Sequence, residues 1–185
     1  MRFAIIVGNE PVHKIYQECI AAITNECVAS GHSLDLYYIS TVDFNSILDL
    51  DCWILLHPGD FDPRANVERP FTVFYQGEPA TRSHFERQSI PWIEYSDVVF
   101  EMCGHSYEKT LEVAGNKPVK KIYIGYDQAF CLSDQEFDYE YDVGFVGARS
   151  PRRNRVIKKL NAQGYRVWDS TNLWGYDRWS MLKKT

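Results

Sequence analysis

The chain has 185 residues and a formal net charge of −5, with 45% hydrophobic and 24% charged positions. These values are typical of a folded globular protein, and the 15% aromatic share excludes disorder. The acidic net charge argues against a generally basic nucleic-acid coat, so nucleic acid is not indicated as a partner, and no apolar run of about 18 residues predicts a membrane span.

Short apolar runs alternate with stretches of helical spacing. Residues 3–7 predict a buried parallel strand, and apolar positions over 15–29 predict a helix that ends at Gly31. Five further strands are expected at residues 34–39, 52–56, 71–75, 98–102 and 121–124. This alternation predicts an α/β fold with a doubly wound, mostly parallel Rossmann-like sheet.

Polar residues follow several of these strands, namely Asn9, His57, Asp60, Glu78 and His105. In doubly wound sheets, ligands bind at the carboxyl ends of the strands, so these residues are candidates for a site. The alternative is that loops are exposed and therefore polar.

The composition changes after residue 126. Residues 127–142 contain six acidic residues and neither Lys nor Arg, whereas residues 149–166 are basic and contain no acid. We expect a first, Rossmann-like domain at 1–126, an acidic linker at 127–141 and the incomplete start of a second domain at 142–185.

The second unit reads as a partial β-α-β unit. A strand at 142–147 leads to a helix that starts after Ser150 and ends at Gly164, and a strand follows at 165–168. No element is predicted beyond residue 168. Three tryptophans lie near this end of the chain, namely Trp168, Trp174 and Trp179. They indicate a surface that is covered by a partner chain, a second copy or a missing part of the protein. The alternative is that they pack on the first domain.

The turn after this strand has the features of a diphosphate site. Gly147 stands before a helix N-terminus, whose unpaired N–H groups favour an anion. The neighbouring arginines carry forked donors suited to phosphate oxygens, and they are Arg149, Arg152 and Arg153. The alternative is a solvated basic helix face, to which Arg155, Lys158 and Lys159 are assigned. Neither a dinucleotide fingerprint nor a P-loop motif occurs.

Several segments resemble GT-B glycosyltransferases, especially the group 1 and spore-maturation types. Residues 141–147 and 151–153, with Leu160, Gly164-Tyr165 and Val167, resemble the start of their C-terminal domain. Residues 124–127 with Phe130 resemble the segment that precedes that domain. Residues 74–79 are similar to an element of fucosyltransferases.

The resemblance implies transfer of a sugar from a nucleotide-diphosphate sugar, without a cofactor or a metal, to an unknown acceptor. The resemblance makes residues 1–126 an acceptor-type domain and residues 142–185 the incomplete start of a donor-type domain. Donor contacts in such enzymes come mostly from the later C-terminal domain, often through an E-x7-E-like element, and this chain ends before that element could occur. We therefore expect such an enzyme, or its N-terminal portion, which then needs its missing half for activity.

The same resemblance suggests roles for the candidate residues. Gly147, Arg149, Arg152 and Arg153 would hold the diphosphate, and Asn9 and Asp60 would contact the acceptor. Glu78 is the first choice for a catalytic base, with His57 and His105 as alternates, and a turn carboxylate that caps the backbone is the alternative for Glu78. A retaining enzyme would need no such base. Four aromatic residues are candidates for stacking on sugar rings, or for core or edge packing, and they are Tyr37, Tyr38, Tyr75 and Trp92.

Two other readings remain. In the first, the chain is a non-catalytic module derived from half of such an enzyme, which binds an anion or a nucleotide or serves as an interaction module. A flavodoxin-like or response-regulator-like domain ranks last, because residues 8–11 offer neither a phosphate loop nor paired carboxylates. Five widely spaced cysteines without a C-x-x-C pair disfavour a disulfide framework or a zinc site and indicate a cytoplasmic protein.

Overall fold

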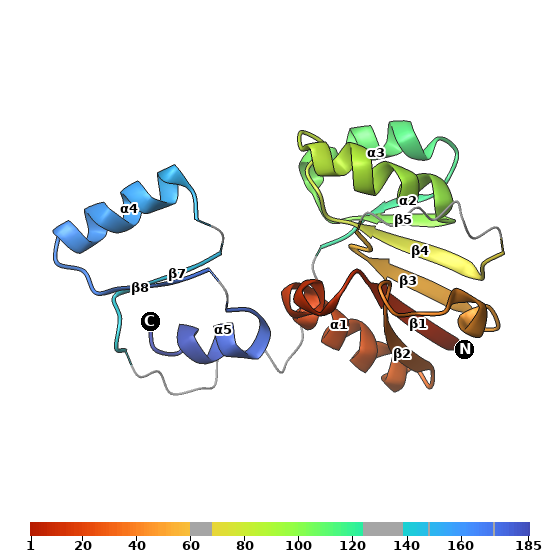
Figure 1. Ribbon diagram of the computed structural model, residues 1–185, viewed down its shortest axis with the longest axis horizontal. Helices are drawn as coiled ribbons and strands as arrows, with labels where there is room; N and C mark the ends of the chain where they lie inside the picture. The colour runs from red at the N-terminus through yellow and green to blue at the C-terminus, as the bar shows by residue number, and fades with distance from the viewer. Residues whose placement is uncertain (60–67, 124–138, 148, 172) are drawn as a thin grey trace. The chain divides into compact units, whose positions relative to one another are not determined.

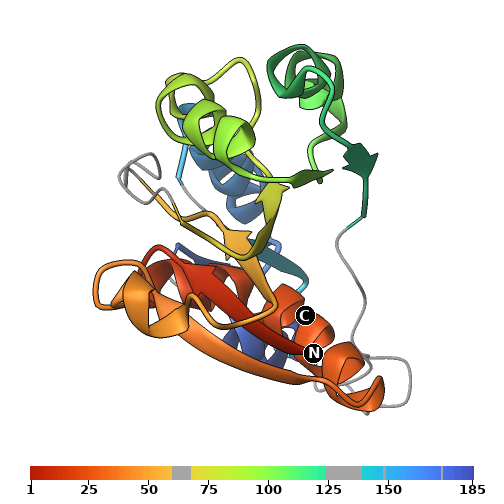
Figure 2. The same ribbon diagram turned by 90° about the vertical axis from the view of Figure 1, so that its right-hand side faces the viewer.

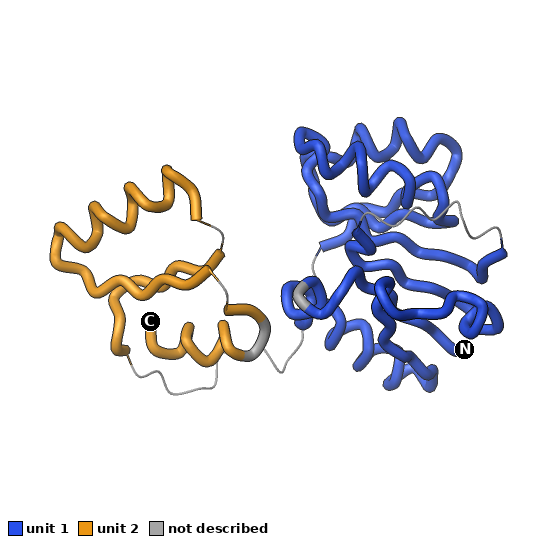
Figure 3. The backbone as a smooth tube through the Cα atoms, in the orientation of Figure 1, with its two compact units in different colours: residues 1–125 blue, residues 126–185 orange. Residues whose placement is uncertain are grey.

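The computed structural model describes residues 1–59, 68–123, 139–147, 149–171 and 173–185. The chain divides into two compact units, residues 1–125 and 126–185 (Figure 3). Most of the predicted acidic linker lies outside the described residues, and so does Asp60. Within the described residues, no helix combines the length and apolar character needed to cross a bilayer.

Unit 1 contains a six-stranded sheet in which every neighbouring pair is parallel, with the order β2-β1-β3-β4-β5-β6 (Figures 1 and 2). The strands are β1 (Arg2–Val7), β2 (Ser33–Tyr38), β3 (Cys52–Leu56), β4 (Phe71–Gln76), β5 (Val98–Glu101) and β6 (Val119–Lys121). The predicted α/β class with a doubly wound parallel sheet is confirmed.

Helices cover both faces of this sheet (Figure 1). On one face, α1 (Glu10–Ala29) packs Cys19 and Ile20 into a cluster with Val7. On the other face, α2 (Ile90–Tyr95) packs Trp92 into a cluster with Phe74, and α3 (Tyr107–Ala114) lies beside α2. Successive side chains of a strand point to opposite faces, which is why central strands carry continuous apolar runs.

The first helix begins five residues earlier than predicted. Asn9 has extended backbone, and its side-chain oxygen accepts a hydrogen bond from the N–H of Val12 at 3.0 Å. This N-cap starts the helix at Glu10, before the apolar periodicity begins. At the other end, Gly31 has a φ of +76°, which agrees with its predicted role in ending the helix.

The prediction of a strand at 121–124 was wrong in position. The strand is β6, at the sheet edge, where Lys120 pairs with Phe100 and Lys121 pairs with Glu101. An edge strand tolerates lysines because one side of its backbone is not paired within the sheet. Because the lysines interrupt the apolar pattern, the sequence pattern placed this strand too late in the chain.

Unit 2 forms a second sheet of two parallel strands, β7 (Val143–Val146) and β8 (Val167–Ser170). They are connected through α4 (Pro151–Ala162), as the predicted β-α-β unit requires. The expectation that no element follows was wrong, because α5 (Gly175–Leu182) covers the opposite side of these strands from α4 (Figure 1). The N–H of Tyr141 donates to the carbonyl of Lys184 at 2.9 Å, which ties the chain end to this sheet.

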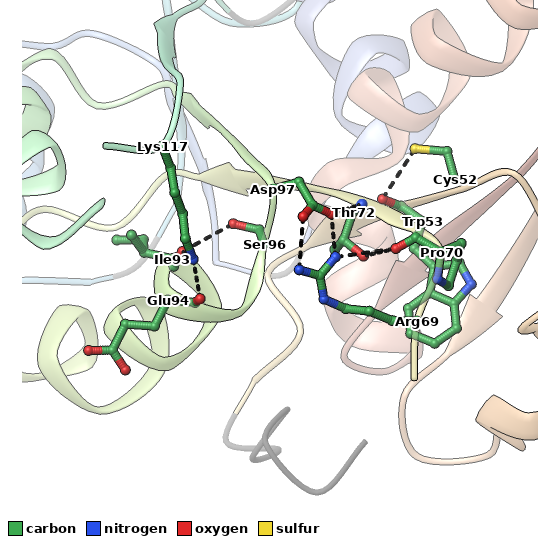
Figure 4. A network of polar contacts seen from close by, with 10 residues as sticks. All are labelled: Cys52, Trp53, Arg69, Pro70, Thr72, Ile93, Glu94, Ser96, Asp97 and Lys117. Carbon is green, nitrogen blue, oxygen red and sulfur yellow. Dashed lines mark hydrogen bonds and ion pairs between the residues drawn. The ribbon is translucent and has the colours of Figure 1, made fainter. Parts of the chain in front are cut away.

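An ion-pair network closes the amino-terminal edge of the sheet in unit 1 (Figure 4). Arg69 donates both terminal nitrogens to the Asp97 carboxylate, and the N–H of Thr72 donates to the same carboxylate at 2.8 Å. Arg69 also lies over the ring of Tyr95, 4.8 Å from its centroid. Partial burial raises the pKa of Asp97, but these hydrogen bonds and the charges of Arg69 and Lys117 outweigh it and hold that pKa below its usual value.

We expect Asp97→Asn to lower the free energy of unfolding at neutral pH by about 1–2 kcal/mol, because it removes charge-assisted hydrogen bonds from a partly screened carboxylate. A depressed folded pKa stabilises the protein above the unfolded value of about 4, and this contribution is lost as the pH falls through the folded pKa. Urea unfolding at several pH values should therefore show a smaller loss of stability on acidification in the variant.

Asp49→Asn is the matched control for this prediction. Asp49 is also paired with an arginine, Arg2, at 3.1 Å, but its side chain is 71% exposed. Exposed pairs contribute at most about 1 kcal/mol. Equal effects of the two substitutions would contradict the assignment of a stabilising role to the Arg69–Asp97 pair.

Candidate functional site

The carboxyl edge of β1, β3 and β4 brings together two of the predicted catalytic residues. The strand order reverses between β1 and β3, and ligands of doubly wound sheets bind at such a switch point. The two loops approach closely here, since a β-carbon built on Gly8 would lie 3.0 Å from the carbonyl oxygen of His57. Glycine at position 8 therefore lets the loop after β1 pass the loop after β3.

His57 and Glu78 face each other across this edge. His57 Nδ1 lies 3.9 Å from Glu78 Oε1, and the side chains are 26% and 20% exposed. His57 has a φ of +46°, a left-handed backbone conformation that non-glycine residues rarely adopt. Such strained positions gather at functional sites, and the pair retains access to solvent.

Two further side chains complete this cluster. The ring of Tyr16 from α1 lies 6.0 Å from that of His57 at an interplanar angle of 30°. Burial, followed by the charges of Glu78 and Cys19, raises the pKa of Tyr16 to about 12, so the phenol stays protonated. On the other side, Arg82 Nη1 lies 3.9 Å from Glu78 Oε2. The carboxylate thus lies between a phenol, an imidazole and a guanidinium group.

The backbone of Glu78 is held by a buried amide. Gln76 Nε2 donates to the carbonyl of Glu78 at 2.5 Å, and Gln76 Oε1 accepts from its N–H at 3.0 Å. Ser89 Oγ donates to the same Oε1 at 2.9 Å, and Ser106 Oγ donates to the Glu78 carbonyl at 3.2 Å. The turn that carries Glu78 is therefore fixed on the end of β4.

A buried carboxyl group supports this amide. Glu101 is 0% exposed and accepts hydrogen bonds from Thr110 Oγ1 and from the N–H of Cys103. Burial raises the pKa of Glu101, while the bonds from Thr110, Cys103 and Gln76 oppose that rise. Gln76 and Glu101 were not among the predicted site residues. Each is a polar residue that ends an apolar strand, and this position is the signal that could have identified them.

Among the described residues of unit 1, the other predicted site residues lie outside this cluster. The side-chain oxygen of Asn9 is used to cap α1. His105 is exposed in a 3-10 turn at Gly104–Ser106 after β5, and it is not part of the His57–Glu78 pair. Trp92 is 2% exposed in the core and offers no ring for stacking, whereas Tyr75 is half-buried on β4.

In unit 2, α4 begins directly after the turn at Gly147. Ser150 caps the helix, its Oγ accepting from the N–H of Arg153 at 3.2 Å. Gly147 has a φ of +120°, and a β-carbon there would lie 2.8 Å from Arg153 Nη1. Gly147 was predicted to help hold the diphosphate. In the structure, the group that approaches Gly147 is the guanidinium of Arg153, which also lies 5.5 Å from the centroid of the Phe145 ring.

Arg149 and Arg152 differ in their surroundings. Arg149 pairs with Asp169 at the end of β8 and donates to Asn154 Oδ1 at 3.2 Å. Arg152 is exposed on the first turn of α4. Three arginines therefore lie near the N-terminus of α4. The carboxylate of Asp169 is paired with Arg149, so an anion that binds to Arg149 would have to displace it.

No family model and no curated protein matches this sequence. Solved structures match its fold. An alpha-glucosyltransferase in complex with UDP-glucose and DNA containing an abasic site aligns with 92% of this chain and 57% of its own, at 12% identity and a TM-score of 0.65. An alpha-glucosyltransferase with UDP and a 13-mer DNA containing a HMU base aligns with 99% and 69%, at 11% identity and a TM-score of 0.64.

A third structure, an alpha-glucosyltransferase in complex with UDP, aligns with 99% of this chain and 70% of its own, at 12% identity and a TM-score of 0.61. The predicted resemblance to GT-B glycosyltransferases is therefore confirmed at the level of the fold, and the chain spans little more than half of the first of these proteins. The expectation that nucleic acid is not indicated is not borne out, because two of these neighbours hold DNA.

Proposed function

We propose that the chain is a glycosyltransferase, or the N-terminal portion of one, that uses a nucleotide-diphosphate sugar as donor. The observation that carries the proposal is the fold match with an alpha-glucosyltransferase bound to UDP-glucose, which extends over 92% of the chain and so includes both units. The arginines at the start of α4 and the carboxylate–imidazole pair after β3 and β4 support it chemically.

The reaction divides between these groups. The acceptor hydroxyl oxygen forms a bond to the anomeric carbon of the donor sugar, and the bond from that carbon to the diphosphate oxygen breaks. The electron pair of the broken bond leaves with the nucleoside diphosphate, and the acceptor proton passes to a base. Glu78 is the proposed base, with His57 beside it, and the arginines of α4 stabilise the charge on the leaving diphosphate.

The second candidate is a module that binds the donor or another anion without transfer. An anion site at the start of α4 can hold a ligand without completing an active site, which is the basis of this alternative. Release of nucleoside diphosphate or transfer of sugar by the purified 185-residue chain would exclude the non-catalytic module. Binding of UDP-glucose with neither reaction would instead favour it.

Charge reversal at Arg149 tests the donor site. We expect Arg149→Glu to weaken UDP-glucose binding, measured by isothermal titration calorimetry, by about 10- to 100-fold, because a charge-assisted hydrogen bond contributes about 1.5–3 kcal/mol. Arg155→Glu makes the same change of charge farther along α4, at an exposed position, and should leave the affinity within about threefold.

Arg149→Glu places a carboxylate beside Asp169, and the repulsion between them could by itself disturb the fold. A second variant controls for this effect. Arg152→Glu alters an exposed residue on the first turn of α4 and should weaken binding in the same direction. Equal affinities of the wild type and of both variants would overturn the assignment of the diphosphate to this helix start.

A further inference from the structure

A cavity of about 440 Å³ opens in unit 1 between α1 and the sheet. Its walls are formed by Ala22, Ile23 and Cys27 of α1 and by Ile54, Tyr75 and Phe100 of the sheet. On this face α1 packs against β1 and β2, so the strands β4 and β5 lie beyond the helix (Figure 1). The volume is within the range of about 300–1,000 Å³ that is usual for small-molecule sites.

The lining is mostly apolar, and the charged residue among the described lining residues is Glu26, at an exposed position of α1. Burial raises the pKa of Tyr75, and burial raises the pKa of Cys19 to about 11, so the phenol and the thiol are neutral at pH 7. Tyr75 and Phe100 form an edge-to-face pair with centroids 5.1 Å apart. Two aromatic rings and the polarizable thioether of Met102 favour a flat, uncharged ring system.

The cavity shares a wall with the His57–Glu78 cluster. Tyr75 and Gly77 follow each other on one face of the β4 chain, and a β-carbon on Gly77 would lie 3.0 Å from the methyl carbon of Met102, which lines the cavity. The same β-carbon would lie 3.4 Å from the hydroxyl of Tyr16, which belongs to the cluster. Gly77 therefore adjoins both the cavity lining and the cluster, and Glu78 is the next residue in the chain.

We propose that this cavity binds the apolar ring system of a hydroxyl-bearing acceptor, a phenol or a fused-ring alcohol, and presents its hydroxyl to Glu78. The proposal rests on the proposed function, since it names the class of acceptor for the same site. It also predicts binding in the absence of any donor, and this allows the two proposals to fail separately.

The test uses 2-naphthol as the ligand and the full chain without donor, with binding measured by calorimetry. We expect a dissociation constant on the order of 100 µM, in line with the affinity of a small, mostly apolar ligand. Ala22→Phe fills the cavity and should weaken binding by at least about tenfold. Ala21→Phe adds the same ring at the neighbouring position of α1, outside the described lining, and should leave binding unchanged.

Two comparisons test the orientation and the chemical class. Glu78→Gln should weaken 2-naphthol severalfold and leave 2-methoxynaphthalene, which has no hydroxyl to donate, unaffected. Decan-1-ol should bind more weakly than 2-naphthol to the wild type. The proposal is overturned by absence of naphthol binding, by equal affinities of wild type and Ala22→Phe, by a Glu78→Gln variant that treats both naphthalenes alike, or by tighter binding of decan-1-ol.

Titrations of the same samples with UDP-glucose test the proposed function independently of the acceptor proposal. Loss of naphthol binding together with intact, Arg149-dependent donor binding would leave the glycosyltransferase proposal standing with a different acceptor. Naphthol binding that depends on Ala22, without any donor binding, would instead leave an apolar ligand site and overturn the assignment of a donor site to this chain.

Discussion

Replacement of Glu78 by glutamine is expected to lower the rate of sugar transfer by about 10²–10⁴-fold, the usual contribution of a positioned general base. The amide cannot take the acceptor proton, yet it matches the carboxylate in size. Gln76 and Ser106 hold the backbone of residue 78 rather than its side chain, so the turn should keep its shape. The measurement is the rate of nucleoside diphosphate release in the presence of donor and acceptor.

Glu86→Gln is the matched control. Glu86 is an exposed glutamate in a π-helical turn at Phe85–Ser89, and its loss changes the net charge by the same amount. An equal fall in rate for both substitutions, or an unchanged rate for Glu78→Gln, would contradict a catalytic role for Glu78. The second outcome is the one expected of an enzyme that needs no base.

The neighbouring histidine adds a second criterion. His57 has a φ of +46°, and asparagine tolerates this conformation better than most residues. The substitution His57→Asn therefore removes the imidazole with little backbone strain. If His57 and Glu78 act as one unit, the double variant should be no slower than the slower single variant. Multiplicative losses would indicate that the two residues, 3.9 Å apart, act independently.

The central strands were predictable from the sequence because they are buried on both faces. Residues 3–7 and 52–56 are apolar throughout, and the structure places them in adjacent strands β1 and β3. The order of the strands is a different matter, because it depends on which crossover each connection takes. Periodicity therefore placed His57 and Glu78 at strand ends but did not show that they would meet.

The residues that support the site were missed for a related reason. Tyr16 lies on α1, far from Glu78 in sequence, and its approach to His57 follows from the packing of that helix on the sheet. Glu101 would ordinarily be assigned to the surface, and it is buried because Thr110 and the N–H of Cys103 satisfy its oxygens. Long-range packing of this kind leaves no short-range pattern in a single sequence.

In unit 2 the helix α5 was missed because its local sequence signal is weak. The helix α4 has a serine N-cap and was predicted, whereas α5 has no side-chain N-cap and begins at Gly175. Its position is fixed by contacts that the sequence does not display. A β-carbon on Gly144 of β7 would lie 2.9 Å from Thr185 Oγ1, so the glycine makes room for the chain end after α5.

Substitution of Trp53 by alanine is expected to destabilise unit 1 by about 3–5 kcal/mol, the usual effect of emptying a buried aromatic position. Trp53 lies on β3 and is 0% exposed. Its ring packs at 5.3 Å from that of Phe44, and its Nε1 donates to the carbonyl of Ile47 at 3.0 Å. Urea unfolding followed by circular dichroism should show the shift. Phe71→Ala, which removes a ring that is 52% exposed, should cost far less.

A milder variant, Trp53→Phe, separates stability from binding. It keeps an aromatic ring but removes the indole N–H that donates to the Ile47 carbonyl, to which the N–H of Leu50 still donates at 3.4 Å, so we expect a loss of about 1–3 kcal/mol. Trp53 belongs to the core on the α2 side of the sheet, and the next residue, Ile54, lines the cavity on the α1 side. Since neighbouring residues of a strand face opposite sides, 2-naphthol should bind to folded Trp53→Phe as it binds to the wild type. A weaker affinity would mean that the two faces of the sheet are coupled, and the cavity could then no longer be treated as a preformed site independent of the opposite core.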